Sequence, residues 1–113
     1  HGYRWIDYQD VPEEEEREHM RLAIAAQENT TGSRPIGWYT GRLSENTIKL
    51  VAEEGGFMYS CDSYADDLPY YQRVETRNGP KSLLMIPYTL DNNDMKFCVP
   101  PGFSAPEAWF QDL

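Results

Sequence analysis

The sequence has 113 residues, of which 10 are Lys or Arg and 19 are Asp or Glu, so its formal charge is −9. This length suits one small domain or a part of a larger one, and an acidic chain without basic clusters is not expected to bind nucleic acid or an anionic membrane. No apolar run approaches the roughly 20 residues that a membrane-spanning helix requires, so the sequence predicts a soluble protein.

The first predicted elements are a short strand or loop, residues 1–6, and a long helix. Asp10 can cap the helix, and Glu13 follows three residues later, as in a capping box. The four glutamates that begin at Glu13 suit the positive end of the helix dipole, and they indicate a solvated helix start rather than a metal site. Gly32 is expected to end the helix, and His19 is expected to be a surface imidazole.

Residues 36–39 form the next β-prone segment. A second helix is expected to begin at a Ser44 cap and to end at Gly55, and residues 57–60 form a further strand. Residues 83–86 are apolar at every position, which is typical of a strand covered on both faces. The alternation of strands and helices predicts parallel strands joined by right-handed crossovers.

A polar, tyrosine-rich stretch, residues 62–80, separates the last two predicted strands. It has no helical period, so we expect a loop, and loops of that length are usually functional or disordered. Residues 108–110 look like the first turn of a helix. The chain starts without Met and stops within this turn, so we expect residues 1–113 to be an internal fragment of a single larger domain.

The two cysteines, Cys61 and Cys98, are too few and too far apart for a disulfide framework or a zinc knuckle. We expect reduced thiols in a cytoplasmic protein. The sequence leaves a single bridge between them open.

Polar, charged and aromatic residues are concentrated at the end of each predicted strand. In parallel α/β folds the carboxyl ends of the strands carry the reactive groups. The segments concerned are residues 1–5, 34–42, 62–67 and 87–94. A histidine, carboxylates, arginines and aromatic faces can together bind a small polar ring and activate water. Taken singly, Asp62 is equally a turn residue, Arg34 an ion-pair donor, and Trp5 or Trp38 a packing residue.

Five segments carry a resemblance to a known family. They are HGYRWIDY (residues 1–8), RPIGWYTGR (34–42), EGGF (54–57), DSYADDLPY (62–70) and IPYTLDNNDM (86–95). In order and spacing they resemble the metal-independent allantoinases of the polysaccharide deacetylase (NodB-like) superfamily. The resemblance covers the middle part of the family's domain. It implies an α/β fold, part of a distorted (β/α) barrel of the NodB type, in a homo-oligomer that hydrolyses allantoin to allantoate.

The resemblance also implies a site without a metal. Metal-dependent deacetylases of the superfamily carry a His-x-x-x-His motif that binds the ion; His1 matches its first histidine and Trp5 replaces the second. Since tryptophan cannot ligate zinc, no metal and no other cofactor is expected. Arg34 matches the Arg-Pro of the third motif, where the arginine orients a carboxylate, and Asp62 matches the acidic residue of the fourth. The motif that supplies the general base is expected upstream of this chain.

The resemblance implies that His1 and Arg34 take part in catalysis, with His1 binding substrate or handling a proton. The implied substrate-binding residues are Trp5, Trp38, Asp62 and Asp94. Two alternatives remain: a metal-dependent carbohydrate N-deacetylase, which Trp5 disfavours, and an inactive fragment that acts only as a structural piece.

Overall fold

The computed structural model describes residues 1–90, 93, 95, 100 and 105–112. The elements in chain order are α1 (Glu13–Thr31), β1 (Gly37–Trp38), α2 (Thr47–Glu54), β2 (Tyr59–Ser60), β3 (Tyr70–Val74), β4 (Lys81–Met85) and α3 (Pro106–Asp112). No helix in the described part of the chain is both long enough and apolar enough to span a membrane.

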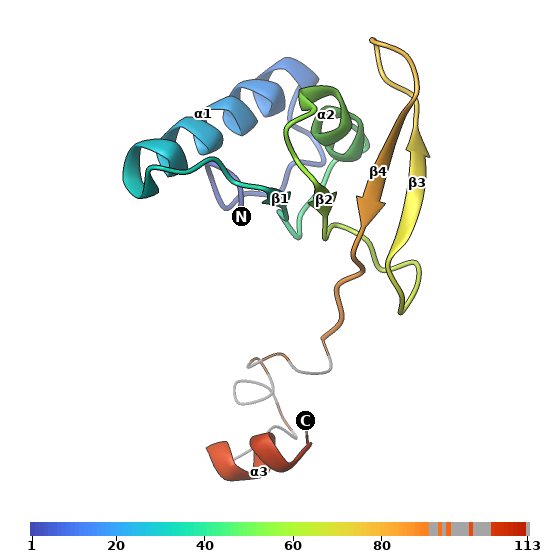
Figure 1. The fold of residues 1–113 in the computed structure, drawn as a ribbon. Coiled ribbons are helices and arrows are strands. Elements are labelled where there is room, and N and C mark those ends of the chain that lie inside the picture. The colour runs from blue at the N-terminus through green and yellow to red at the C-terminus, as the bar shows by residue number, and fades with distance from the viewer. Residues whose placement is uncertain (91–92, 94, 96–99, 101–104, 113) are drawn as a thin grey trace.

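The four strands form one sheet in the order β1-β2-β4-β3. The three strands β1, β2 and β4 are parallel, as predicted, and β3 is antiparallel to β4. In Figure 1 the parallel strands run downward, so that their carboxyl ends all lie at the lower edge of the sheet. This common edge is where the predicted site residues are expected to meet.

The prediction of a continuous loop over residues 62–80 is wrong. Its second half contains β3, whose residues Tyr70–Val74 pair with Lys81–Met85 in a hairpin. The turn depends on Gly79, which has a φ of 94°, and on Thr76, whose Oγ1 donates to the Gly79 carbonyl at 2.6 Å. Only the two ends of β3 are even partly buried, so the strand lacks the apolar alternation that reveals a strand in sequence.

Of the two possibilities predicted for residues 1–6, a short strand or a loop, the structure shows a loop, since residues 1–8 form neither helix nor strand. Helix α1 follows them, but Asp10 does not cap it: the cap residue is Pro12, without a side-chain hydrogen bond. Within α1, Glu13 and Arg17 form an ion pair one helical turn apart, at 2.7 Å. The expected stop is confirmed, since Gly32 has a φ of 73° and its N–H donates to the Glu28 carbonyl.

One glutamate and the histidine of α1, Glu16 and His19, are more buried than the sequence predicted. Glu16 is buried and accepts hydrogen bonds from the Ser44 hydroxyl at 2.6 Å and from the Thr47 hydroxyl. His19 is only 7% exposed, which corrects the expectation of a surface imidazole. Glu16 faces the start of α2, and His19 faces the N-terminal segment, where it contacts the rings of Tyr3 and Tyr8.

Helix α2 begins three residues later than the predicted cap, Ser44. Its cap residue is Asn46, which makes no side-chain capping bond, while the Ser44 N–H donates to Thr47 Oγ1 at 2.9 Å. Ser44 therefore lies just before the helix and hydrogen-bonds to its first residue, Thr47, instead of serving as the cap residue. The predicted end is confirmed, since Gly55 follows the helix with a φ of 78°.

The core lies between α1, α2 and one face of the sheet. Its buried residues are Met20, Ile24, Trp38, Leu50, Val51, Ala52, Phe57, Val74, Leu83 and Met85. Along β4, Leu83 and Met85 are buried while Leu84 is only half-buried, so the strand is fully covered on one face and partly on the other. In Figure 1 α1 and α2 lie side by side, above β1 and β2 and to the left of the β3–β4 hairpin, and the Arg17–Glu53 and Lys49–Glu13 ion pairs join the two helices.

Candidate functional site

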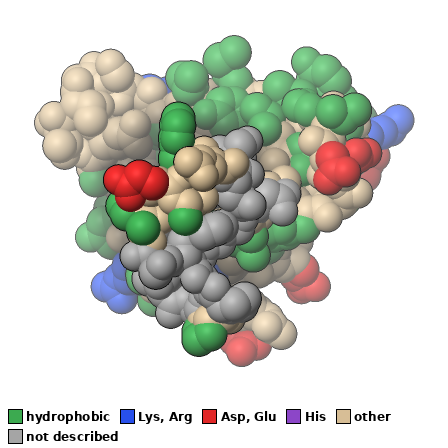
Figure 2. Space-filling model, turned by 90° about the horizontal axis from the view of Figure 1, so that it is seen from below, with side chains coloured by type: hydrophobic (Ala, Val, Ile, Leu, Met, Phe, Trp, Pro, Cys, Tyr) green, Lys and Arg blue, Asp and Glu red, His purple; other side chains and the backbone are tan. Residues whose placement is uncertain are grey.

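A cleft of about 430 Å³ opens where the parallel strands end. It is lined by His1, Trp5, Tyr39, Thr40, Gly41, Arg42, Tyr64, Tyr88, Leu90 and Asn93. These residues come from the N-terminal segment and from the segments that follow β1, β2 and β4. Figure 2 shows the molecule from this side, where hydrophobic side chains form much of the visible surface. The structure thus brings together residues from all four segments that the sequence singled out.

Aromatic rings build one wall of the cleft. Tyr39 and Tyr88 are stacked with ring centroids 5.0 Å apart, and Tyr64 meets Tyr88 edge-on at 6.2 Å. His1 packs edge-on against Tyr39 at 5.2 Å. Burial raises the pKa of the Tyr39 phenol, and a hydrogen bond with Tyr64 raises it further, so at neutral pH Tyr39 carries its proton. The wall is therefore a set of flat aromatic faces that includes the neutral hydroxyl of Tyr39.

Trp5 and Arg42 form a second group in the cleft. The guanidinium carbon of Arg42 lies 4.6 Å from the centroid of the Trp5 ring, within cation–π range. Trp5 is 70% exposed, and its ring is 6.3 Å from that of His1. The sequence predicted Trp5 as a flat pocket wall, and its place beside the cleft is compatible with that role.

Asp62 lies behind the cleft rather than in it. The residue is only 4% exposed. Its carboxylate accepts hydrogen bonds from the Thr40 N–H, at 2.9 and 3.0 Å to its two oxygens, and from the Gly41 N–H at 2.8 Å. Burial raises the pKa of this carboxyl, and the two backbone donors partly offset that rise. Asp62 therefore holds the loop after β1, whose residues line the cleft.

Trp38 is a core residue. It is 8% exposed, and its ring centroid lies 5.3 Å from that of Phe57. One part of it lines a small cavity of about 100 Å³ together with His1 and Tyr39. Its Nε1 is buried and has no hydrogen-bond partner within the described residues. The predicted contact between Trp38 and substrate stays a prediction.

Arg34 is not brought to the cleft. It precedes β1, at the opposite end of the strands, where it pairs with Glu54 at the end of α2. Its guanidinium carbon lies 5.4 Å from the centroid of the Phe57 ring. This placement favours the ion-pair role that the sequence left open for Arg34 over the orientation of an active-site carboxylate.

Three further sequence predictions concern Asp94, Cys61 and Cys98. Asp94 and Cys98 lie outside the described residues. Cys61 is a free, half-buried thiol just after β2. Burial raises its pKa, with a smaller contribution from the Asp62 charge, so this thiol is a poor nucleophile at neutral pH.

The residues that sequence reasoning passed over are Tyr39, Arg42, Tyr64 and Tyr88. They stand within the segments quoted for the resemblance, but no feature of the sequence separates them from their neighbours. In the part of the chain that the structure describes, no three His, Cys, Asp or Glu side chains are grouped closely enough to hold a metal ion.

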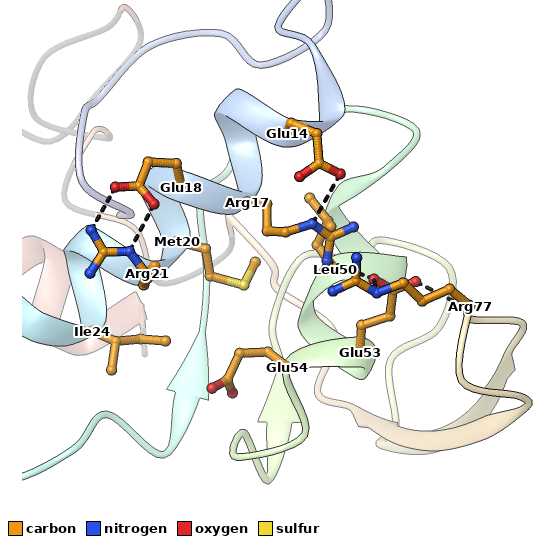
Figure 3. A pocket seen from close by; sticks show the side chains of 10 residues that line it. All are labelled: Glu14, Arg17, Glu18, Met20, Arg21, Ile24, Leu50, Glu53, Glu54 and Arg77. Carbon is orange, nitrogen blue, oxygen red and sulfur yellow. Dashed lines mark hydrogen bonds and ion pairs between the residues drawn. The ribbon is translucent and has the colours of Figure 1, made fainter.

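A second cavity, of about 300 Å³, lies between α1 and α2 (Figure 3). Met20, Ile24 and Leu50 are its apolar residues. The charged side chains around it are paired with one another or with Arg34: Arg17 with Glu14 and Glu53, Arg77 with Glu53, Arg21 with Glu18, and Glu54 with Arg34. With these charges satisfied, the cavity is structural, and the cleft at the strand ends is the candidate site.

The chain is similar to part of several known proteins, although no protein-family model matches it. A Schizosaccharomyces pombe protein provisionally named a polysaccharide deacetylase is 41% identical over 115 residues, which cover 91% of this chain and 36% of that protein. A crystal structure from Pseudomonas aeruginosa, also provisionally named a polysaccharide deacetylase, has 55% identity and a TM-score of 0.84 over 99% of this chain and 37% of its own.

The crystal structure of PuuE allantoinase is equally similar, with 54% identity and a TM-score of 0.83 over 99% of this chain and 36% of its own. This chain thus spans little more than a third of the length of these relatives. The agreement over nearly every residue confirms the predicted fold class. The chain has the mixed α/β fold of the corresponding part of NodB-like polysaccharide deacetylase structures.

Proposed function

We propose that the chain is an internal segment of a single polysaccharide deacetylase-like domain, and that the whole protein is a hydrolase that opens the cyclic ureide of allantoin to allantoate. The observation that carries the proposal is the 54% identity to PuuE allantoinase over 99% of the chain. Trp5, at the position of a metal-binding histidine in the related deacetylases, supports hydrolysis without a metal. The proposal includes a cytoplasmic homo-oligomer that needs no cofactor.

The cleft suits a small, flat and polar ring. Its stacked tyrosines and Trp5 offer aromatic faces, while Asn93, Arg42 and His1 offer polar groups. Most binding sites for small molecules combine apolar walls with a few polar groups in this way.

Ring opening by water requires a base that deprotonates the water, donors that stabilise the oxyanion and an acid that protonates the leaving nitrogen. We assign proton handling or substrate binding to His1, which lies beside Tyr39 in the cleft. Asp94 is proposed as a polar contact to substrate. The general base is expected upstream of residue 1, so the 113-residue chain alone should be inactive.

A metal-dependent carbohydrate N-deacetylase is the second candidate. The names of the S. pombe and P. aeruginosa relatives favour it. Trp5 disfavours it, because a catalytic zinc site uses about three protein ligands, and this position lacks one of them.

The test compares two substrates in the whole protein, with and without EDTA. We expect allantoin to be converted to allantoate at the same rate in EDTA, and no acetate to be released from N-acetylated chitooligosaccharides. Acetate release that EDTA abolishes and zinc restores, without allantoin turnover, would establish the second candidate instead. A Trp5→Phe variant, which keeps a flat ring and still lacks a ligand, should retain metal-independent turnover.

A further inference from the structure

Arg42 is held in place from two sides. Its carbonyl oxygen accepts a hydrogen bond from the Tyr8 N–H at 3.0 Å, and the N–H of the preceding Gly41 donates to Asp62 at 2.8 Å. Its guanidinium lies over the Trp5 ring. A long side chain whose backbone and head group are both fixed loses little further freedom when it binds a ligand.

The Arg42 guanidinium also differs from most of the other arginines in its partners. The arginines that pair with a carboxylate are Arg17, Arg21, Arg34, Arg73 and Arg77. Within the described residues, Arg42 has no carboxylate partner and its side chain makes no hydrogen bond, although the chain carries 19 acidic residues.

The described lining of the cleft contains no Asp or Glu. The carboxylate of Asp62, behind the lining, accepts hydrogen bonds from the Thr40 and Gly41 N–H groups. The cleft of this acidic chain is therefore positive at Arg42. A planar guanidinium with unused N–H donors matches a carboxylate, which it can bind through two parallel hydrogen bonds.

We propose that Arg42, supported by Trp5, forms a carboxylate-binding subsite that holds the carboxylate of the acyclic ureide produced by ring opening. This inference rests on the proposed function. In that reaction the water oxygen bonds to the ring amide carbon, the C–N bond breaks, the nitrogen takes up a proton, and the new acid loses one. The group created at that carbon is a carboxylate, and it is absent from the uncharged ring.

The experiment measures the binding of two ligands to the whole protein by calorimetry. Allantoate carries the carboxylate, and hydantoin is an uncharged ring of the same class. Arg42→Gln should weaken allantoate binding by about 10-fold or more, because it removes charge-assisted hydrogen bonds to the ligand's carboxylate. Hydantoin binding should change less than about twofold, which a merely structural role of Arg42 would not allow. The allantoate affinity of Arg42→Lys should lie between that of the wild type and that of Arg42→Gln.

The matched control is Arg73→Gln, which removes an exposed arginine of the β3 hairpin that pairs with Glu75. It should leave both affinities unchanged. Allantoin turnover is measured in the same samples, so that the two proposals can fail separately. If the wild type does not turn over allantoin but binds allantoate, and Arg42→Gln loses that binding, the subsite stands and the proposed function fails. Unchanged allantoate affinity in Arg42→Gln, equal loss of both ligands, or no carboxylate binding by the wild type would overturn the subsite.

Discussion

The hydroxyl of Tyr8 lies 3.2 Å from Nδ1 of His19, and both side chains are buried. The same hydroxyl lies 3.4 Å from the carbonyl oxygen of Arg4. Burial raises the pKa of the Tyr8 phenol, so its single proton stays on the oxygen at neutral pH. Both contacts are hydrogen bonds only if Nδ1 of His19 donates to Tyr8 while Tyr8 donates to Arg4. This chain of bonds ties the segment that carries His1 and Trp5 to α1.

Tyr8→Phe should therefore destabilise the protein. It leaves the His19 imidazole without its buried partner, and a buried polar group without a partner costs about 1–3 kcal/mol. Tyr71→Phe is the matched control, because Tyr71 is 73% exposed, and it should change the free energy of unfolding by less than about 0.5 kcal/mol. Denaturant unfolding of the two variants checks this prediction, and equal small effects would contradict it.

The sequence predicted the elements whose signals are local. Both long helices end at a glycine with positive φ, as expected for Gly32 and Gly55, and the parallel pairing of the strands follows from the alternation of element types. Strand β3 was missed because most of its side chains are exposed, so its existence depends on pairing with β4. The position of His19 was missed because its partner, Tyr8, lies 11 residues away in an irregular segment.

The site was predicted at the level of segments and less well at the level of side chains. The segments after the strands do converge on one cleft, as parallel topology requires. Arg34 was placed in the site because its motif stands beside β1, but it precedes the strand and so lies at the other end of the sheet. Arg42, after the same strand, reaches the cleft. The two arginines are eight residues apart in the sequence, but they lie at opposite ends of β1 because one precedes the strand and the other follows it.

The buried carboxylate of Glu16 should depend on both hydroxyls that it contacts. Thr47→Val keeps the shape of the side chain and removes one donor, which should lower the free energy of unfolding by about 1–3 kcal/mol. Thr30→Val is the control, since Thr30 is exposed and its hydroxyl bonds only the Ala26 carbonyl within the same helix. Denaturant unfolding compares the variants. If Thr47→Val costs no more than Thr30→Val, Glu16 does not link α1 to the start of α2.

Asp62 should give the stability a pH dependence opposite to that of the ion-paired carboxylates. Because its pKa is raised in the folded state, the native protein binds this proton more tightly than the unfolded chain does. Its contribution is therefore fully present below the ordinary pKa, near 3.8, and is lost as the pH rises through the raised folded value. Asp62→Asn removes this titration.

The measurement is the melting temperature of the wild type minus that of Asp62→Asn, across a pH series that begins below pH 4. We expect this difference to be largest at the lowest pH and to decrease as the pH rises. Taking the difference removes the opposite slope of carboxylates with lowered pKa values, such as Glu53. A difference that grows with pH would show that the backbone hydrogen bonds outweigh burial at Asp62.

His1 and Arg34 should separate catalysis from stability in the whole protein. His1 is exposed in the cleft beside Tyr39 and Trp5, so His1→Ala removes a group that can reach substrate without disturbing the core. Loss of a positioned proton-handling group lowers the rate by a factor of about 100 to 10,000. The expected result is a loss of allantoin kcat/KM in that range with an unchanged melting temperature.

Arg34→Ala should show the reverse. It leaves Glu54 without its partner and uncovers the Phe57 ring, so the melting temperature should fall, while kcat/KM at a temperature where the variant is folded should change less than about threefold. Arg34→Lys keeps the charge and should recover part of the melting temperature. A loss of kcat/KM in Arg34→Ala as large as that in His1→Ala, with both variants folded, would return Arg34 to the catalytic role that the family motif implies. That result would require residues outside the described part of the chain to connect Arg34 with the cleft, because within it the two lie at opposite ends of the strands.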